Sequence, residues 1–594
     1  MNKVKVADYI ADYIASLGVK HVFLIPGGAN VSMVDSISKH QDLKHVCNHH
    51  EQAAAMAAEA YGRVGGNIGV CVTTVGPAAT NAVTGIMGAW TDSIATLYLC
   101  GQVKREVMMT DGLRQMGVQE INIVDIARPI TKYCEIVSDP NDIKYHLEKA
   151  LYLAKTGRPG PVLLDIPSDV QTAEVDLDSI RTFNPEDEGL TIEVPSELES
   201  QITELLTLLK NAKKPVIFAG HGIRLAGADQ EFLKLVEKLN VPILTSMSAH
   251  DLIPTDHPLF VGRPGVFGDR AGNFAIQNAD LLISIGARHH LWNIGYNYKE
   301  FAKNAKKVVI DIDKNELKKK TVIPDIAINC DAKTFIEALL KVAKPKQDIS
   351  EWIARGIGWK KKYPVVLPSY KEEKGFVNSY YFTDVLSDAL KEGDIIMTGV
   401  GTSFTGTLQS FKVKKDQRLF SSIGCASMGY DLPSAIGGWF STGKDRIILL
   451  TGDGSIMMNL QELQTIHHYN IPVKIFLINN NGYLAIKNTQ NSFFQGNLVA
   501  VDKESGVSFP SFEDVAKTFK LAYFEMKDHS NVRAIIDQAL EHPGPVLCEI
   551  RMSPNQPLLP KVYSEKLADG TMVSKPLEDM FPFLDREEFD QNML

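Results

Sequence analysis

Short apolar runs alternate with segments of helical periodicity along most of the chain. Alternation of buried strands with helices predicts parallel sheets covered by helices on both faces. We therefore expect an α/β protein made of doubly wound parallel-sheet domains. The runs predicted to be buried strands are residues 21–25, 68–73, 95–100, 162–166, 215–219, 281–285, 307–312, 395–398, 446–451 and 473–478.

Two changes in composition predict domain boundaries. Residues 184–200 are acidic and contain proline, and residues 343–375 are rich in lysine, proline and charge. The chain of 594 residues has room for several domains of ordinary size. We expect three domains, at residues 1–184, 196–343 and 373–557, and an irregular docked tail at 558–594.

One nine-residue pattern occurs twice. Residues 158–166 (RPGPVLLDI) resemble residues 542–550 (HPGPVLCEI), and each copy stands near the end of a predicted domain. The pattern suggests that the first and third domains are related α/β units. A common turn at the entry to a strand is the alternative explanation.

Charge and composition exclude several classes of protein. The net charge is −9 and no long basic run occurs, which argues against a nucleic-acid partner. No stretch approaches 18 apolar residues, so we expect no membrane span. The seven cysteines form no Cys-x-x-Cys pair, and the N-terminus lacks the apolar core of a signal peptide. We expect a cytoplasmic protein with free thiols.

The most specific motif follows the predicted strand 446–451. It reads Thr-Gly-Asp-Gly-Ser, and Asn-Asn-Asn-Gly follows the next strand. Gly452 and Gly454 would let the backbone approach a phosphate, and the next helix would offer free N–H groups. Asp453 and Asn480 would meet beyond the carboxyl edge of one sheet, and their oxygens suit Mg²⁺. A pair of ordinary strand ends is the alternative.

A second motif begins an alanine-rich helical pattern at residues 49–63. Glu51 lies in its first turn, after a strand-like run at residues 44–47. Considered alone, Glu51 is explained as an acid that complements the helix dipole.

Together these motifs resemble the thiamine-diphosphate-dependent enzymes, in particular the acetolactate synthase branch, over residues 4–557. The resemblance implies that Asp453, Asn480 and the carbonyl of Gly482 hold Mg²⁺ on the cofactor's diphosphate. It also implies that Glu51 hydrogen-bonds the cofactor's pyrimidine ring and activates the cofactor, whose reactivity the protein directs by geometry and electrostatics.

Further residues match the family's cofactor-binding segments. These are Gly27, Gly28, Pro77, Asn81, Gly401, Thr402, Ser403, Ser427, Met428, Gly452, Gly454, Ser455, Tyr483 and Leu484. Met428 matches the apolar residue that bends the cofactor, although core packing would also suit its flexible thioether. Gln119 and the segment from Tyr483 onward would face the substrates, and a hydrogen-bonded core amide is the alternative for Gln119.

The resemblance implies a homo-oligomer with active sites at the subunit interface, because the glutamate domain of one subunit faces the metal domain of another. Whether the assembly is a dimer or a tetramer stays open. FAD binding by the central domain also stays open. Its glycine turns and Arg288 lie where the synthases contact FAD, but Arg263-Pro264 replaces their Met-His.

Three departures concern the substrates. Thr402-Ser403-Phe404 replaces a Gln-His-Gln run, Thr489 replaces the tryptophan that favours 2-ketobutyrate, and the tail differs. We expect a carboligase that decarboxylates a 2-keto acid, pyruvate first, and transfers the two-carbon unit to an acceptor carbonyl. The alternatives are a 2-keto acid decarboxylase or carbon–carbon lyase, and a non-catalytic nucleotide-binding relative. The acceptor itself is undetermined; the tail and residues 294–299 resemble a subgroup linked to surface-polysaccharide synthesis.

Overall fold

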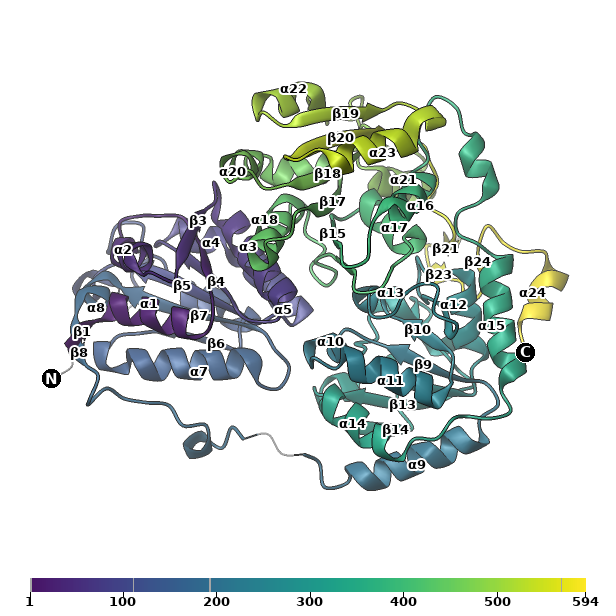
Figure 1. Cartoon of the computed structure of the whole chain (residues 1–594), viewed down its shortest axis with the longest axis horizontal. Coiled ribbons are helices and arrows are strands. Elements are labelled where there is room, and N and C mark those ends of the chain that lie inside the picture. Colours follow the sequence, from purple (N-terminus) through teal and green to yellow (C-terminus); the bar gives the residue numbers. More distant parts are fainter. Residues whose placement is uncertain (1–2, 110–111, 192–193, 568) are drawn as a thin grey trace.

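The computed structural model describes residues 3–109, 112–191, 194–567 and 569–594. It contains three six-stranded sheets in which every pairing is parallel, and helices cover their faces (Figure 1). The predicted α/β class with three parallel-sheet domains is confirmed. The ten predicted strands all occur, with ends that differ by at most two residues.

The first domain is joined to the others by an extended segment after residue 176 (Figure 1). Its elements are β1 (Lys3–Lys5), α1 (Val6–Ser16), β2 (His21–Leu24), α2 (Val31–Lys39), β3 (Lys44–Cys47), α3 (Glu51–Gly65), β4 (Gly69–Thr73), α4 (Pro77–Asn81), α5 (Val83–Asp92), β5 (Thr96–Gln102), α6 (Ile123–Ala127), β6 (Tyr133–Ile136), α7 (Ile143–Lys155), β7 (Pro161–Pro167), α8 (Ser168–Thr172) and β8 (Glu174–Asp176).

The central domain includes a helix where the sequence predicted a linker. Its elements are α9 (Leu198–Asn211), β9 (Pro215–Ala219), α10 (Gly222–Leu225), α11 (Asp229–Leu239), β10 (Ile243–Thr245), β11 (Phe260–Gly262), α12 (Arg270–Asn278), β12 (Leu281–Ile285), α13 (Leu291–Ile294), β13 (Lys306–Asp311), β14 (Ile326–Asn329), α14 (Ala332–Val342) and α15 (Ser350–Lys362). Helix α15 buries Trp352 and Trp359 against this domain, so the lysine-rich composition marks its solvated face.

The third domain and the tail contain the remaining elements. They are α16 (Ser379–Ala389), β15 (Ile395–Thr398), α17 (Thr402–Ser410), β16 (Arg418–Phe420), α18 (Asp431–Thr442), β17 (Ile447–Gly452), α19 (Asp453–Ile456), α20 (Glu462–His468), β18 (Val473–Asn479), α21 (Leu484–Phe493), α22 (Phe512–Thr518), β19 (Ala522–Met526), α23 (Val532–Glu541), β20 (Val546–Arg551), β21 (Lys561–Val562), β22 (Ser564–Lys566), β23 (Met572–Ser574), β24 (Met580–Phe581) and α24 (Arg586–Asn592).

The first and third sheets have the same topology. Their strand orders are β3-β2-β4-β5-β7-β6 and β16-β15-β17-β18-β20-β19. The repeated nine-residue pattern ends in β7 and β20, which occupy the same position in these orders. The two domains are thus built alike, whereas the central sheet has the order β11-β10-β9-β12-β13-β14.

The tail is docked on the central domain. Val562, Leu577 and Met580 belong to the central core, and the side chain of Asn273 donates to the carbonyl of Leu577 at 2.8 Å. The tail is more regular than predicted, because it contains two short pairs of strands, β21–β24 and β22–β23, and the helix α24.

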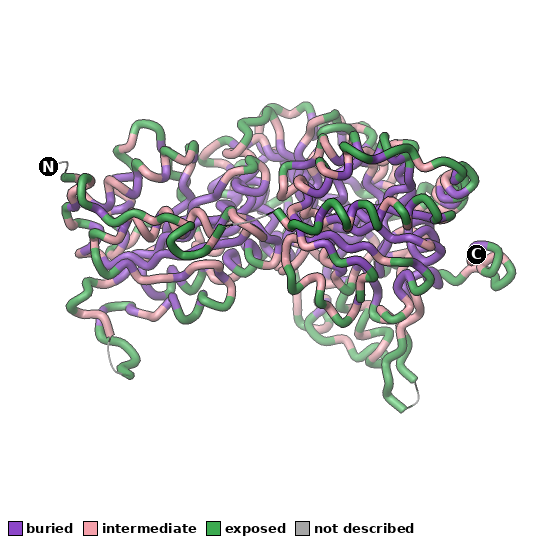
Figure 2. Tube along the Cα trace, turned by 90° about the horizontal axis from the view of Figure 1, so that it is seen from below, coloured by how far each residue is buried: buried purple, intermediate pink, exposed green. Residues whose placement is uncertain are grey.

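Buried residues fill the interiors of the domains, and exposed segments cover their outer surfaces (Figure 2). All seven cysteines are described and none is bonded to another. No helix in the described ranges is long and apolar enough to cross a membrane.

Candidate functional site

Asp453 and Asn480 meet at the carboxyl edge of the third sheet. Strands β17 and β18 pair with Gly452 opposite Ile478, which places the two following loops side by side. Asp453 is 2% exposed, and its carboxylate accepts hydrogen bonds from the backbone N–H groups of Asn480 and Gly482, each at 3.1 Å. Burial raises the pKa of Asp453 to about 6, although the backbone donors oppose that shift.

The amide oxygen of Asn480 is buried and has no hydrogen-bond partner. A buried carboxylate therefore lies beside an unpartnered buried oxygen, and no cationic side chain of the described residues pairs with either. Such groups cost free energy unless something binds them. No group of three His, Cys, Asp or Glu side chains in the described part of the chain could hold a metal. A cation at this edge would need amide, carbonyl and ligand oxygens besides Asp453.

The glycine motif shapes the space above this edge. A Cβ atom on Gly454 would lie 2.1 Å from Cε1 of Tyr483 and 3.3 Å from the methyl group of Met428. A Cβ atom on Gly452 would meet nothing within 4 Å. Gly454 therefore lets Tyr483 and Met428 approach the loop, while Gly452 borders open space.

These residues line a cavity of about 530 Å³, here called the main cavity. It brings together Gly401, Thr402, Met428, Gly452, Asp453, Gly454, Ser455, Asn480, Gly482, Tyr483 and Leu484 from the sequence prediction. Ser403 and Ser427 are not among its lining residues. Ser403 is buried, and its hydroxyl donates to the carbonyl of Val400 at 3.3 Å.

The remaining predicted residues collect at the carboxyl edge of the first sheet. Glu51 begins α3, and its carboxylate accepts a hydrogen bond from Asn81 at 2.9 Å. The backbone carbonyl of Gln119 lies only 2.0 Å from a Cβ placed on Gly76, next to Pro77. Gly28, Pro77, Asn81 and Gln119 are exposed, and no residue of this edge lines the main cavity.

The main cavity has further walls in the central domain and the tail, where no site residue was predicted. Phe267, Trp292 and Tyr296 come from the central domain, and Lys561 and Tyr563 come from the tail. The tail was noted for its departure from the synthases and, with residues 294–299, for its resemblance to one subgroup. Its docking between domains depends on contacts that no local pattern reveals.

A buried polar network joins the first and third domains. Arg63 donates to Asp92 at 2.7 Å and to Glu59 at 2.9 Å, and the hydroxyl of Tyr430 donates to Glu59 at 2.5 Å. Asp92 also accepts the backbone N–H of Gly424 at 2.7 Å. The network holds the loop that carries Met428.

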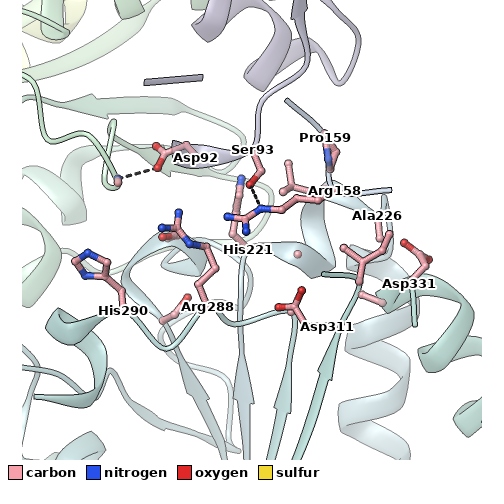
Figure 3. Close-up of a pocket in the computed structure, with 18 of the residues that line it drawn as sticks. Asp92, Ser93, Arg158, Pro159, His221, Ala226, Arg288, His290, Asp311 and Asp331 are labelled. Carbon is pink, nitrogen blue, oxygen red and sulfur yellow. Dashed lines mark hydrogen bonds between the residues drawn. The ribbon is translucent and has the colours of Figure 1, made fainter. Parts of the chain in front are cut away.

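A second cavity of about 450 Å³ lies at the carboxyl edge of the central sheet (Figure 3). Arg158, from the first domain, donates to Ser93 at 2.8 Å and faces the same space as Arg288 and His221. Both ring nitrogens of His221 are buried without a partner, and burial lowers its pKa to about 3. Burial also raises the pKa of Asp311, at the end of β13, to about 6.

Comparison with known proteins gives a consistent result across the chain. Residues 4–126, 202–339 and 399–550 match, in order, the N-terminal TPP binding domain, the central domain and the C-terminal TPP binding domain of thiamine pyrophosphate enzymes.

Three full-length relatives are acetolactate synthases. The large subunit from Cyanidium caldarium is 34% identical over 94% of this chain and 94% of that protein. The large subunit from Lactococcus lactis subsp. lactis (strain IL1403) is 33% identical over 92% of each chain. Acetolactate synthase 1, chloroplastic, from Zea mays is 32% identical over 95% of this chain and 89% of that protein. With the three matched domains and these relatives, the chain belongs to the thiamine-diphosphate-dependent enzymes, as a transferase of the acetolactate synthase type.

Proposed function

We propose that this enzyme is a carboligase. It would decarboxylate a 2-keto acid, with pyruvate as the expected donor, and transfer the remaining two-carbon unit to the carbonyl group of an acceptor. The observation that carries the proposal is the buried pair of Asp453 and the unpartnered amide oxygen of Asn480 at the edge of the main cavity, which the central domain and the tail also line. The thiamine diphosphate that this family binds supplies, when bound, a carbon nucleophile for the keto acid.

Asp453, the side chain of Asn480 and the carbonyl of Gly482 would hold Mg²⁺ on the diphosphate. The oxygen donors suit this ion, which commonly takes few protein ligands and completes its shell with phosphate oxygens and water. The burial of the Asp453 carboxylate and of the Asn480 amide oxygen supports the roles of these two residues. For Gly482 it records the backbone N–H, which donates to Asp453.

Glu51 would act from a second copy of the chain. Its carboxyl would share a proton with a ring nitrogen of the cofactor, which requires that water be excluded. In the single chain Glu51 is partly exposed and does not line the main cavity. A second copy placed over the main cavity would supply both the carboxyl group and the missing wall.

Exposed apolar side chains border both parts of the proposed interface. The first domain exposes Met87, Trp90, Leu113, Met116 and Val118, and the third domain exposes Met458, Ile486, Phe494 and Val499. Large exposed apolar side chains gathered near one site are typical of an interface. We propose a homo-oligomer, either a dimer or a tetramer.

The experiment that tests the carboligase is product analysis. Purified enzyme with thiamine diphosphate, Mg²⁺ and pyruvate should release CO₂ and form a longer product when an aldehyde, a 2-keto acid or a ketose derivative is added, as read by mass spectrometry. Free acetaldehyde as the sole product, whatever carbonyl compound is added, would establish a decarboxylase instead. Inactivity with a broad set of keto acids would support a non-catalytic relative.

The second cavity would bind a dinucleotide, and FAD is the candidate. It lies at the carboxyl edge beside β9, where the strand order reverses and open sheets bind such ligands. A Cβ on Gly222 would lie 2.8 Å from Cα of Gly286, so these turns pack backbone to backbone under the cavity. Arg158 and Arg288 line the cavity, where a pyrophosphate would compete with Asp313 and Glu316 for the guanidinium of Arg158.

A flavin in this cavity is tested by spectroscopy. The purified protein should show visible flavin absorbance, or added FAD should lose fluorescence on binding, and Arg288→Ala should weaken that binding. A protein that neither retains nor takes up FAD would contradict the flavin while leaving the carboligase untouched.

A further inference from the structure

The main cavity has a single cationic side chain. Among the residues that line it, only Asp453 and Lys561 carry charge. Asp453 belongs to the proposed metal site at the end of β17. Lys561 comes from the docked tail, in β21.

The backbone around Lys561 is fixed to two domains. Lys561 pairs with Phe581 in the β21–β24 ladder, and the N–H of Val562 donates to the carbonyl of Val266 at 2.9 Å. The side chain of Gln409 donates to the carbonyl of Pro560 at 2.7 Å. The position of Lys561 is therefore determined by the folded tail and not by a free terminus.

The ammonium group of Lys561 has no ion pair and no hydrogen bond to any described residue, although the side chain is partly buried and burial lowers its pKa. Other lysines whose pKa is lowered by burial have partners. Lys132 donates to the carbonyls of Thr156 and Arg158, at 2.6 and 2.7 Å. Lys474 donates to the carbonyl of Gly544 at 2.7 Å. Lys561 differs from these lysines because its ammonium group has no partner among the described residues and the side chain lines a cavity, so an anion in that cavity would supply the partner.

The cavity continues outward next to this lysine. An adjoining cavity of about 540 Å³ shares Tyr296, Phe493 and Ser564 with the main cavity and extends under the β22–β23 hairpin. Ser564 follows Lys561 by three positions, so the lysine lies near the junction. Space on this side suits the second substrate, which must reach the reaction site after the keto acid has bound.

We propose that Lys561 binds the anionic group of the acceptor substrate, either a carboxylate or a phosphate, and so selects charged acceptors over neutral ones. The proposal rests on the carboligase function proposed above. Lys561 is the only cation that lines the cavity, and charge-assisted hydrogen bonds are the strong ones in a partly buried site. Lys561 would position the acceptor and would take no part in bond making.

The test compares Lys561→Ala with the wild-type enzyme on matched acceptors, with pyruvate as donor. Glyceraldehyde 3-phosphate is matched by glyceraldehyde, and 2-ketobutyrate is matched by propanal. Lys566→Ala removes an exposed lysine of the same tail and is the control. Lys561→Arg keeps the charge. Loss of one charged hydrogen bond should raise the acceptor KM by roughly ten- to a hundredfold.

The expected result is a higher KM for the phosphate or carboxylate acceptor in Lys561→Ala, with the KM for pyruvate and the rate with its neutral counterpart unchanged. Activity with the neutral acceptor also shows that the variant folds. Lys561→Arg should restore most of the preference, and the acceptor whose KM changes identifies the anion. An equal change for charged and neutral acceptors, or a higher KM for pyruvate alone, would overturn the proposal. Absence of any cofactor-dependent CO₂ release by the wild-type enzyme would instead refute the carboligase.

Discussion

At the scale of single residues, the main cavity is lined by two charged side chains that come from different segments, Asp453 at the end of β17 and Lys561 in the tail. Within the described residues, Asp453 is a buried carboxylate with no ion pair, and Lys561 is a partly buried cation with none. Backbone N–H groups partly compensate the carboxylate of Asp453, and a bound ligand would add a charged partner for each residue. In the proposed function, the metal-bound cofactor would lie at Asp453 and the anionic group of the acceptor at Lys561.

The metal role of Asp453 gives the first prediction. Asp453→Ala should weaken Mg²⁺-dependent binding of thiamine diphosphate by at least about a hundredfold, since a charged ligand is removed from a buried site. Isothermal titration calorimetry measures this directly. Asp445→Ala, which changes an exposed aspartate just before β17, is the control and should bind normally. Undiminished binding by Asp453→Ala would rule out the metal site.

Asp165, inside β7, gives a prediction about pH and stability. It is fully buried, and burial raises its pKa to about 7, although a hydrogen bond from Gln102 at 2.8 Å opposes the shift. An aspartate in the unfolded chain has a pKa of roughly 3.9. Between these values the folded protein keeps the proton and the unfolded chain loses it. The contribution of Asp165 to stability is therefore largest below about pH 4, falls as pH rises to about 7, and is constant above that.

Asp165→Asn should remove this dependence, because the amide stays neutral. The free energy of unfolding of the variant, relative to that of the wild type, should increase by roughly 2–4 kcal/mol between pH 4.5 and pH 8. Denaturation midpoints measured in urea at several pH values check this. Asp178→Asn, an exposed change on the same domain, should follow the wild-type profile. A constant difference between Asp165→Asn and the wild type would mean that Asp165 is ionised throughout.

At the scale of elements, helices α3 and α18 join the first and third domains through small residues. A Cβ on Gly437 would lie 2.0 Å from the carbonyl oxygen of Ala57, so the helices approach closely there. Helix α3 begins with Glu51, and α18 follows the loop that carries Met428. The close contact therefore determines where two predicted cofactor contacts lie.

Gly437→Ala should destabilise the protein by about 1–3 kcal/mol, because the added methyl group collides with backbone that cannot move freely. Gly358→Ala is a matched control, since Gly358 lies in α15 with no atom within 4 Å of its would-be Cβ. That change should be neutral or stabilise by up to about 1 kcal/mol. Thermal unfolding of both variants measures the difference, and equal midpoints would show that the helices separate without cost.

At the scale of the whole molecule, the predicted catalytic residues of one chain lie apart. Glu51 and Gln119 are at the edge of the first sheet, while Asp453 and Asn480 line a cavity of the third domain. The proposed function needs both sets in one site, and a second copy would bring them together.

Mixing two inactive variants tests this arrangement. Glu51→Gln and Asp453→Ala should each lose nearly all turnover. If sites form between copies, dissociated and remixed chains should recover roughly a quarter of the wild-type activity, because half of the dimers are mixed and each of those has one intact site. Steady-state rates measure this. Remixing Glu51→Gln with itself is the control, and no recovery in the mixed sample would place the complete site within one chain.

Local sequence patterns predicted most of the fold and one wall of the candidate site. Buried strands of four or five mostly apolar residues that end at a glycine have few other structures available, so β9, β12 and β15 occur where the pattern placed them. The Gly-Asp-Gly motif and the following Asn-Asn could be placed together because consecutive parallel strands end at the same sheet edge. The helix α15 was missed because lysines and prolines around it resemble a linker.

By itself the sequence determined the family, the three parallel sheets and the residues at the carboxyl edge of the third sheet, since strand burial and strand-end chemistry are local properties. Tertiary structure alone decided which distant segments close the main cavity. Lys561 lies far from Asp453 along the chain, and Trp292 and Tyr296 belong to another domain. Their convergence depends on how the tail docks against the central core, and such docking is the sum of many weak contacts between segments that carry no pattern of their own.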